Sequence, residues 1–425
     1  MATIPIESRR LTALDVLRGV AVMGILVMNI NNWGLGRPAY WNTAALGGAE
    51  GANLVVWWFD TLFAADKMRG LFSLMFGAST LLVIQRATAK EEGPARVHYS
   101  RMIALMLLGY MHYAFIWRSD ILVLYACAGL LLFFFHKLSH RGLLLWATAF
   151  FLLAIVPPLL FFTPPGLAGY GLMNNPPGDL LGFFQELNLE NGPNSPQTAQ
   201  DLALHRSGYA ELLHSRLVEN SFSRFEMILY EGAESMSLML IGMALFNRGM
   251  LTGEWTAERY RRWALVGIAI GLAGNVPLAI WQFSDGFSGY SVFTSHILWS
   301  MPFDFAMTIG YAALVMAWVK SSGDTPLVAH IAATGRMAFT NYLLTSIVMT
   351  SIFYGYGLGL TGRLKRAELF LMVIGMWGLM LMWSKPWLDR FNYGPFEWLW
   401  RSMARLKLQP MRRPSVASMP APLKA

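Results

Sequence analysis

The sequence has one cysteine and few charged residues. Cys127 lies inside an apolar run, so a disulfide framework and a cysteine-based metal site are excluded. Only 14% of the 425 residues are charged, whereas a soluble domain carries about a quarter. No cleavable signal peptide is evident, because the first apolar run continues from Leu14 to Ile30 without a cleavage site.

Several catalytic and binding motifs are also missing. There is no GxxxxGK[ST] phosphate loop, GxSxG elbow, HExxH zinc helix or convincing dinucleotide fingerprint. ATP-driven transport and soluble-type hydrolase chemistry are therefore disfavoured, and no metal is expected. The net charge of +8 comes from basic residues in loops without aromatic interleaving, so we expect no nucleic-acid partner.

Long apolar runs dominate the chain instead. Hydrophobic residues make up 55% of it, and runs of about 20 residues are long enough to cross a bilayer as helices. The predicted fold is an all-α, polytopic integral membrane bundle of about ten transmembrane helices with additional interfacial helices. The expected spans are residues 14–31, 68–86, 101–117, 121–136, 143–163, 225–246, 263–282, 296–319, 331–355 and 368–384.

The distribution of Lys and Arg predicts the orientation. With both termini in the cytoplasm of a bacterial inner membrane, most basic residues fall inside, apart from the run Arg363 to Arg366. Residues 53–65 are too short and too interrupted to span, so we expect an interfacial or re-entrant helix there. The lipid bilayer is the predicted partner, and the oligomeric state, a homo-oligomer included, is left open.

Composition divides the chain into four parts. Residues 1–163 form an N-terminal five-span region, and residues 164–222 form a polar extracytoplasmic loop rich in Pro and Asn. Residues 223–409 form a C-terminal five-span domain, and residues 410–425 a disordered cytoplasmic tail. No internal repeat relates the halves, so the sequence gives no direct support to an inverted-repeat transporter.

Polar residues inside apolar spans are costly, so each is a functional hypothesis. In the first span Thr12 and Asp15 fit a capping box, and Arg18 can pair with Asp15 one turn deeper. Asn29 lies almost three whole turns beyond Arg18, which places both on one polar face. Asn29 is either a ligand contact or a hydrogen-bonding group between helices.

Lys67 and Arg69 stand at the predicted outer end of the second span, after Asp66. Two interpretations remain open. Their side chains extend to the interface, or they bind an anion at a helix N-terminus.

His112 and Asp120 are the most specific candidates for catalytic residues. A short turn joins the third and fourth spans and can bring the two side chains together. A histidine oriented by a carboxylate is the usual form of a general base. Against this, Asp120 is also a good helix N-cap, and a lone histidine can bond across helices.

Further polar groups lie in the second half. Glu231 and Glu234, one turn apart, can bind a cation, carry protons or orient a base. Asp304 and Asn341 add polar groups deep in their spans, with helix packing as the alternative for Asn341.

Several segments resemble the YeiB-like bacterial membrane proteins, whose C-terminal domain has no known function. The matching segments are RLTALDVLRGVAVMGILVMNI, KMRGLFSLMFGAS, GYMHYAFIWRSDILVLYACAGLLLFFF, EGAESMSLMLIGMALFNRGML, GRMAFTNYLLTS, FYGYGLGLTGRL and FNYGPFEWLWR. The resemblance covers nearly the whole chain.

The LDVLRG opening is also distantly similar to membrane acyltransferases related to heparan-α-glucosaminide N-acetyltransferase. That group transfers an acyl group from cytoplasmic acyl-CoA to an acceptor on the far side, so the resemblance implies acyl-CoA as co-substrate. Asp15 and Arg18 match its opening motif, and Asn29 matches an outer Asn. Its catalytic histidine follows in the next loop, where this chain has none, so His112 would have to replace it.

Two functions follow. In the first, Arg18 accepts acyl-CoA, His112 with Asp120 or Glu234 deprotonates a small-molecule or envelope acceptor, and Asn29 polarises the acyl carbonyl. In the second, Glu231, Glu234, Asp304 and His112 form the pathway of a proton-coupled secondary transporter or exporter.

Overall fold

The computed structural model describes residues 6–413. Helices joined by loops and turns make up that range, which has no strand and one isolated β-bridge, between Phe391 and Arg412. The helices up to the predicted loop are α1 Ile6–Leu35, α2 Arg37–Trp41, α3 Gly51–Phe59, η1 Asp60–Ala64, α4 Lys67–Ala89, α5 Pro94–Phe115, α6 Leu122–Leu132, η2 Phe133–Phe135 and α7 His140–Gly169. The remainder are α8 Gly178–Asn191, α9 Pro196–Arg206, α10 Tyr209–His214, η3 Ser215–Glu219, α11 Ser223–Asn247, α12 Ala257–Ser284, α13 Gly289–Thr294, η4 Ser295–Trp299, α14 Met301–Ser322, α15 Pro326–Arg336, α16 Ala338–Phe353, α17 Arg366–Arg390 and α18 Pro395–Arg405.

The predicted all-α membrane fold is confirmed. In the described part of the chain, seven helical segments are long and apolar enough to cross a bilayer. They are Thr12–Leu35, Gly51–Ala89, His140–Gly169, Ser223–Asn247, Ala257–Ser284, Met301–Ser322 and Arg366–Arg390. Two more apolar helices, Leu122–Phe135 and Ala338–Phe353, are shorter.

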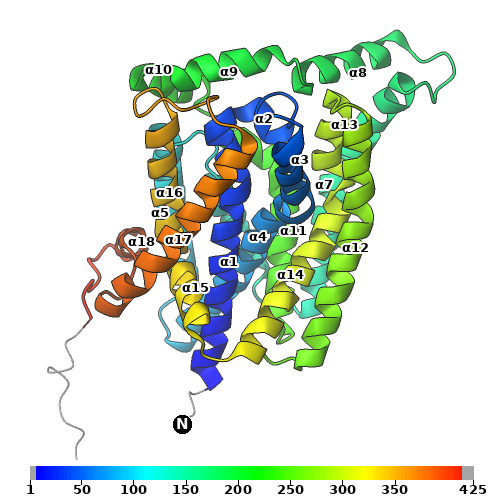
Figure 1. The fold of residues 1–425 in the computed structure, drawn as a ribbon. Helices are drawn as coiled ribbons and strands as arrows, with labels where there is room; N and C mark the ends of the chain where they lie inside the picture. The colour runs from blue at the N-terminus through cyan, green and yellow to red at the C-terminus, as the bar shows by residue number, and fades with distance from the viewer. Residues whose placement is uncertain (1–5, 414–425) are drawn as a thin grey trace, which may run out of the picture.

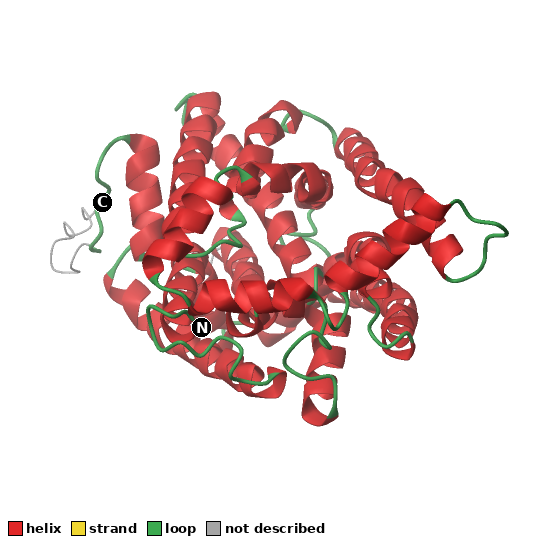
Figure 2. Ribbon diagram, turned by 90° about the horizontal axis from the view of Figure 1, so that it is seen from above, coloured by secondary structure: helices red, strands yellow, loops and turns green. Residues whose placement is uncertain are grey.

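The long helices stand side by side, and α8, α9 and α10 lie across the end of the bundle opposite the N-terminus (Figure 1). Figure 2 shows these connecting helices from above, crossing the ends of the bundle. The segment predicted as a polar loop is thus largely helical, and α7 extends past residue 163 to Gly169.

Two predicted elements differ in their continuity. The expected span 331–355 consists of two helices, α15 and α16, that meet at Met337. The segment expected to be an interfacial or re-entrant helix, residues 53–65, forms α3 and the π-helix η1. A break at Asp66, whose φ of 59° is in the left-handed region, separates η1 from the start of α4. The break interrupts one transmembrane segment.

Of the predicted tail, Pro410 to Arg413 are ordered by hydrogen bonds to Arg390 and Asn392. The Asn392 side-chain amide donates to the carbonyls of Pro410 and Arg412, and backbone bonds join Asn392 to Met411 and Arg413 to Arg390. Residues 414–425 lie outside the described residues.

Glycines allow helices from the two halves of the chain to approach closely. A Cβ added at Gly77 on α4 would lie 1.9 Å from the Met239 carbonyl oxygen of α11. A Cβ added at Gly242 on α11 would lie 1.9 Å from the Leu74 carbonyl oxygen of α4. Small residues that let backbones touch are the usual basis of helix packing in lipid. The α4–α11 crossing therefore joins the N-terminal and C-terminal regions through backbone contact.

Gly77→Ala should lower the melting temperature of the purified protein by several degrees, because the added methyl group forces α4 and α11 apart. Differential scanning fluorimetry in detergent measures this. Gly378→Ala on α17 is the matched control, since a Cβ there meets nothing within 4 Å, and it should leave the melting temperature unchanged or raise it. Equal effects of the two substitutions would contradict the assigned crossing.

The connecting helices are fixed to the bundle at Asp201 on α9. Its carboxylate accepts the backbone N–H of Arg37 at 2.8 Å and lies 3.0 Å from Nδ1 of His205. Burial alone would raise the pKa of Asp201, but hydrogen bonding and charge from His205 and the Arg37 N–H hold that pKa below its ordinary value. The carboxylate therefore stabilises the folded protein in its ionised form.

Asp201→Asn should lower the melting temperature at pH 7, and the difference from wild type should narrow as the pH falls below about 4. A folded-state pKa below the unfolded value gives stabilisation above the unfolded pKa that is lost as the pH falls through the folded one. Scanning fluorimetry between pH 7 and pH 3 tests this, with the exposed Asp179→Asn of α8 as control. A pH-independent difference would rule out the carboxylate as the cause.

Candidate functional site

His112 and Asp120 meet in the interior where α5 passes into α6. Nδ1 of His112 lies 2.8 Å from Oδ1 of Asp120, and both side chains are buried. The other oxygen, Oδ2, accepts the backbone N–H of Val123 at 3.1 Å. One carboxylate oxygen of Asp120 therefore orients His112, and the other accepts a backbone N–H in the first turn of α6.

The second ring nitrogen of His112 is left available. Nε2 is buried and has no hydrogen-bond partner among the described residues. Two aromatic rings pack against the imidazole, with centroid-to-centroid distances of 5.4 Å to Tyr342 and 6.2 Å to Trp117. With Nδ1–H donating to Asp120, Nε2 is a proton acceptor, which is the arrangement of a general base.

The C-terminal part of α1 approaches the same place. Oδ1 of Asn32 accepts a hydrogen bond from Nε1 of Trp117 at 3.0 Å. The predicted Asn29 lies one helical turn before Asn32 and is half-buried.

A second cluster surrounds Arg69, just after the break between α3 and α4. Its guanidinium lies 2.9 Å from the Glu234 carboxylate, 3.4 Å from that of Glu231 and 3.1 Å from that of Asp66. One cation is therefore shared by three carboxylates. Glu234 pairs with Arg69, whereas Asp120 contacts His112. Of the two carboxylates expected from the sequence, Asp120 is therefore the one that orients the histidine.

Lys67 forms a third interaction. Its Nζ lies 2.9 Å from Oδ1 of Asp304 and donates to the Thr61 carbonyl at 2.7 Å, and the Lys67 side chain is only 2% exposed. Asp304 also accepts from Nδ2 of Asn275 at 3.0 Å. Of the two interpretations left open for Lys67 and Arg69, extension of the side chains to the interface does not match the structure, because both side chains turn to carboxylates.

Arg224 connects these clusters. It donates to the Asp120 carbonyl oxygen at 3.2 Å, and its charge acts on the carboxylate of Glu231. The histidine dyad and the Arg69 cluster are thus neighbouring parts of one polar core.

In the N-terminal half of α1, Arg18 pairs with Asp15 at 2.6 Å and donates to Oγ of Ser79 at 2.9 Å. The predicted pair is therefore formed. Other arginines lie near this pair. The guanidinium groups of Arg336 and Arg86 attract the Asp15 carboxylate, and the guanidinium group of Arg18 repels those of Arg101 and Arg401. This end of the bundle carries an excess of positive charge.

Comparisons with known proteins agree with the resemblance noted in the sequence. Residues 245–407 match the family model described as a protein of unknown function, DUF418. The chain is 31% identical to the "uncharacterized protein YeiB" of Escherichia coli (strain K12). The aligned region of 401 residues covers 93% of this chain and 96% of that protein. The chain is 30% identical over 433 residues to the "uncharacterized protein YxaH" of Bacillus subtilis (strain 168), which covers 96% of this chain and 97% of that protein.

This chain belongs to the YeiB-like family. A third relative, an "uncharacterized 39.9 kDa protein in amylase 3'region" of Bacillus acidopullulyticus, is 23% identical over 397 residues and covers 93% of each chain. No solved structure matches the chain.

Within this YeiB-like chain, Asn341 is used for packing. Its amide donates to the Thr334 carbonyl and to Oγ of Ser384, and its Oδ1 accepts from Nε1 of Trp383 at 2.9 Å. These bonds join α15, α16 and α17, which matches the helix-packing interpretation.

Two ionisable groups of the polar core were missed at the sequence level. His296 lies in the π-helix η4, with Nδ1 3.6 Å from Oδ2 of Asp66. Asp60 in η1 accepts from Asn31 at 3.3 Å and lies 3.8 Å from Arg366. Both are ionisable residues within apolar segments, the signal that identified Asp304. The Asp60 contact also explains why Arg366 stands in a predicted outer loop, since its side chain is buried inside the protein.

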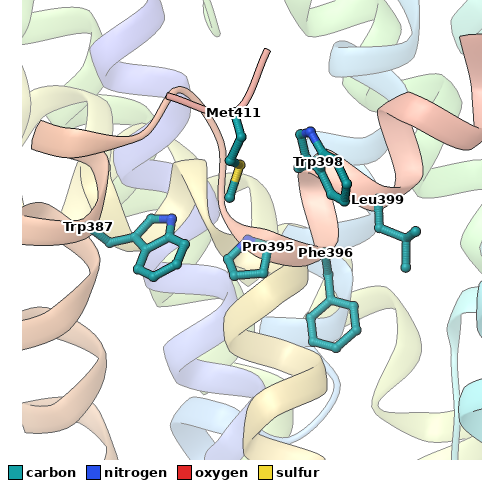
Figure 3. A pocket seen from close by; sticks show the side chains of 6 residues that line it. All are labelled: Trp387, Pro395, Phe396, Trp398, Leu399 and Met411. Atoms are coloured by element: carbon teal, nitrogen blue, oxygen red, sulfur yellow. The ribbon is translucent and has the colours of Figure 1, made fainter. Parts of the chain in front are cut away.

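An apolar pocket of about 390 Å³ lies where α17 meets α18 (Figure 3). Its lining residues are Trp387, Pro395, Phe396, Trp398, Leu399 and Met411. None of them belongs to the predicted site or carries an ionisable group, so the pocket offers no acid–base chemistry.

Lys67→Met and Asp304→Asn should each destabilise the protein by about 3–5 kcal/mol, whereas the double variant should lose much less than the sum. Each single change leaves one buried charge without its partner, and the double change removes both charges. Melting temperatures of the four proteins measure the coupling. Lys385 and Asp389, an exposed pair 2.7 Å apart, form the control cycle, with an expected coupling below about 1 kcal/mol. Additive losses at Lys67 and Asp304 would show that the pair is not coupled.

Proposed function

We propose that this protein is a membrane-embedded acyltransferase that crosses the bacterial inner membrane ten times with both termini in the cytoplasm. The ten passes are α1, α3 with α4, α5, α6, α7, α11, α12, α13 with α14, α15 with α16, and α17. This topology places the excess of arginines near Arg18 at the inner face, as the distribution of basic residues in membrane proteins favours.

The single observation that carries the proposal is the unpartnered Nε2 of His112. A buried ring nitrogen without a partner costs free energy of about 1–3 kcal/mol. Its other nitrogen is held by Asp120 at 2.8 Å, which fixes the ring and stabilises an imidazolium. Such a group serves an acceptor whose hydroxyl or amine must lose a proton as it attacks.

In the proposed reaction, Nε2 of His112 takes the proton from the acceptor. The acceptor oxygen or nitrogen forms a bond to the thioester carbonyl carbon, and the Asn29 amide donates to the developing oxyanion. The carbon–sulfur bond then breaks, and the thiolate of the donor leaves with the proton that His112 carried. Because Nε2 is buried, entry of the acceptor requires side chains around the imidazole, such as Tyr342 or Trp117, to move.

Arg18 and the neighbouring arginines supply the donor end. They offer charge-assisted hydrogen bonds to the phosphates of acyl-CoA at the inner face. Arg18 and Asn29 are eleven residues apart on one helix, a rise of about 16 Å. The donor must therefore carry its acyl group on a long arm, as acyl-CoA does.

His112→Ala should lower acyl transfer from acetyl-CoA at least about 100-fold and leave binding intact, because the general base is lost. Arg18→Ala should instead weaken binding of radiolabelled acetyl-CoA. Both variants are purified in nanodiscs and supplied with a bacterial envelope extract. Bound radiolabel measures acetyl-CoA binding, and released thiol measures acyl transfer.

The matched control is His98→Ala. His98 is a buried histidine of the same helix whose Nε2 contacts the Gly129 carbonyl at 2.8 Å, so its loss should leave turnover per folded protein unchanged. Full transfer by His112→Ala would refute the mechanism, and absence of acetyl-CoA binding by well-folded wild type would refute the acyltransferase proposal.

A proton-coupled secondary transporter or exporter is the second candidate. The observation that favours it is the break between α3 and α4 at a cluster of carboxylates, because discontinuous helices near the midplane are typical of transporters. His296 replaces His112 in the pathway expected from the sequence, since Nδ1 of His296 lies 3.6 Å from Asp66. An uncoupler-sensitive flux that is lost in Glu234→Gln would favour this candidate.

A further inference from the structure

A small polar cavity lies beside the break between α3 and α4. Its polar lining comes from η1, α12, η4 and the residue before α14, namely Thr61, Asn275, Gln282, Ser295, His296 and Ser300. The space accessible inside it is about 10 Å³, which is room for one water molecule or one small ion. Most of its polar groups are neutral side-chain oxygens.

Two of these oxygens have no partner. Oε1 of Gln282 and Oγ of Ser295 are buried without a hydrogen-bond partner among the described residues, and each side chain belongs to a residue only 2% exposed. Oε1 of an amide only accepts hydrogen bonds. Both residues line the same cavity, so one cation or one water molecule there would be able to satisfy both oxygens.

Carboxyl groups outnumber lysine and arginine side chains around the cavity. The carboxyl groups of Asp66, Glu231, Glu234 and Asp304 face the side chains of Lys67 and Arg69. The neighbouring Asp120 and Arg224 add one group of each kind. The carboxyl groups therefore outnumber the lysine and arginine side chains by two, which favours binding of a further cation.

The backbone around the cavity is irregular. Thr61 belongs to the π-helix η1, and Ser295 and His296 belong to the π-helix η4. Such π-helical turns occur frequently at functional sites. Irregular backbone within a membrane is tolerated where it lines a cavity, and broken helices of this kind hold Na⁺ in transporters.

We propose that this cavity is a binding site for a single Na⁺ ion. Hard oxygen donors suit an alkali cation. A site for a multivalent metal is disfavoured, because the described residues contain no group of three His, Cys, Asp or Glu side chains placed to hold one. Bound Na⁺ places a cation where carboxyl groups outnumber basic side chains, and it holds η1, α12 and η4 together at the break.

The test is saturable binding of ²²Na⁺ to the purified full-length protein in detergent, with ionic strength held constant by N-methyl-D-glucamine chloride. Wild type should bind one Na⁺ per chain, and excess unlabelled NaCl should displace the label. NaCl should also raise the melting temperature by at least about 2 °C over the organic salt, because an ion bound only to the folded state stabilises it.

Ser295→Ala should weaken ²²Na⁺ binding at least tenfold and remove the thermal shift. Ser235→Ala on α11 is the matched control, because Oγ of Ser235 is likewise buried without a partner and lies outside the cavity lining. It should retain both responses.

Failure of folded wild type to bind ²²Na⁺ would overturn the proposal and leave the cavity to a water molecule or a proton. Equal loss in Ser295→Ala and Ser235→Ala would also overturn it. Because neither readout uses acetyl-CoA or His112, this result is independent of the proposed acyl transfer.

Discussion

The buried ion pair between Lys67 and Asp304 fixes the centre of the structure. A charge removed from water must be compensated inside the protein, and each of these two groups has its partner 2.9 Å away. Lys67 opens α4 directly after the break and also binds the Thr61 carbonyl of η1, so the two parts of the broken helix are held to one cation. Asp304 brings in α14 and, through Asn275, α12.

The other polar groups are arranged outward from this pair. Arg69 follows Lys67 by two residues and extends to α11, where Glu231 and Glu234 lie one turn apart. Arg224 lies two turns before Glu231 on α11 and donates to the Asp120 carbonyl oxygen, so it connects the histidine dyad. A shift of α4 relative to α11 would therefore disturb both clusters, and Gly77 and Gly242 hold these helices in backbone contact.

Much of this arrangement could be predicted from local sequence. Apolar runs gave the helices, because a bilayer sets their length and composition. The pairs of Asp15 with Arg18 and His112 with Asp120 could be anticipated, since one helical turn or one short interhelical turn separates their members. The partners of Lys67, Arg69 and Glu234 could not, because tertiary packing of α4 against α11 and α14 decides them. The same holds for Asp60 with Arg366, which are far apart in the chain.

Asp120 shows why a structural and a functional interpretation of one residue need not compete. One carboxylate oxygen caps α6 and the other holds His112, so capping alone accounts for only half of its contacts. His98 offers the internal comparison: its Nε2 contacts a backbone carbonyl, whereas Nε2 of His112 is buried with no partner in the part of the chain that the structure describes. Helix packing would be served better by a ring with both nitrogens bonded or by an apolar side chain, because an unsatisfied buried acceptor is destabilising. A histidine fixed on one side and unoccupied on the other is the arrangement that the proposed acyl transfer would use, with Nε2 as the proton acceptor.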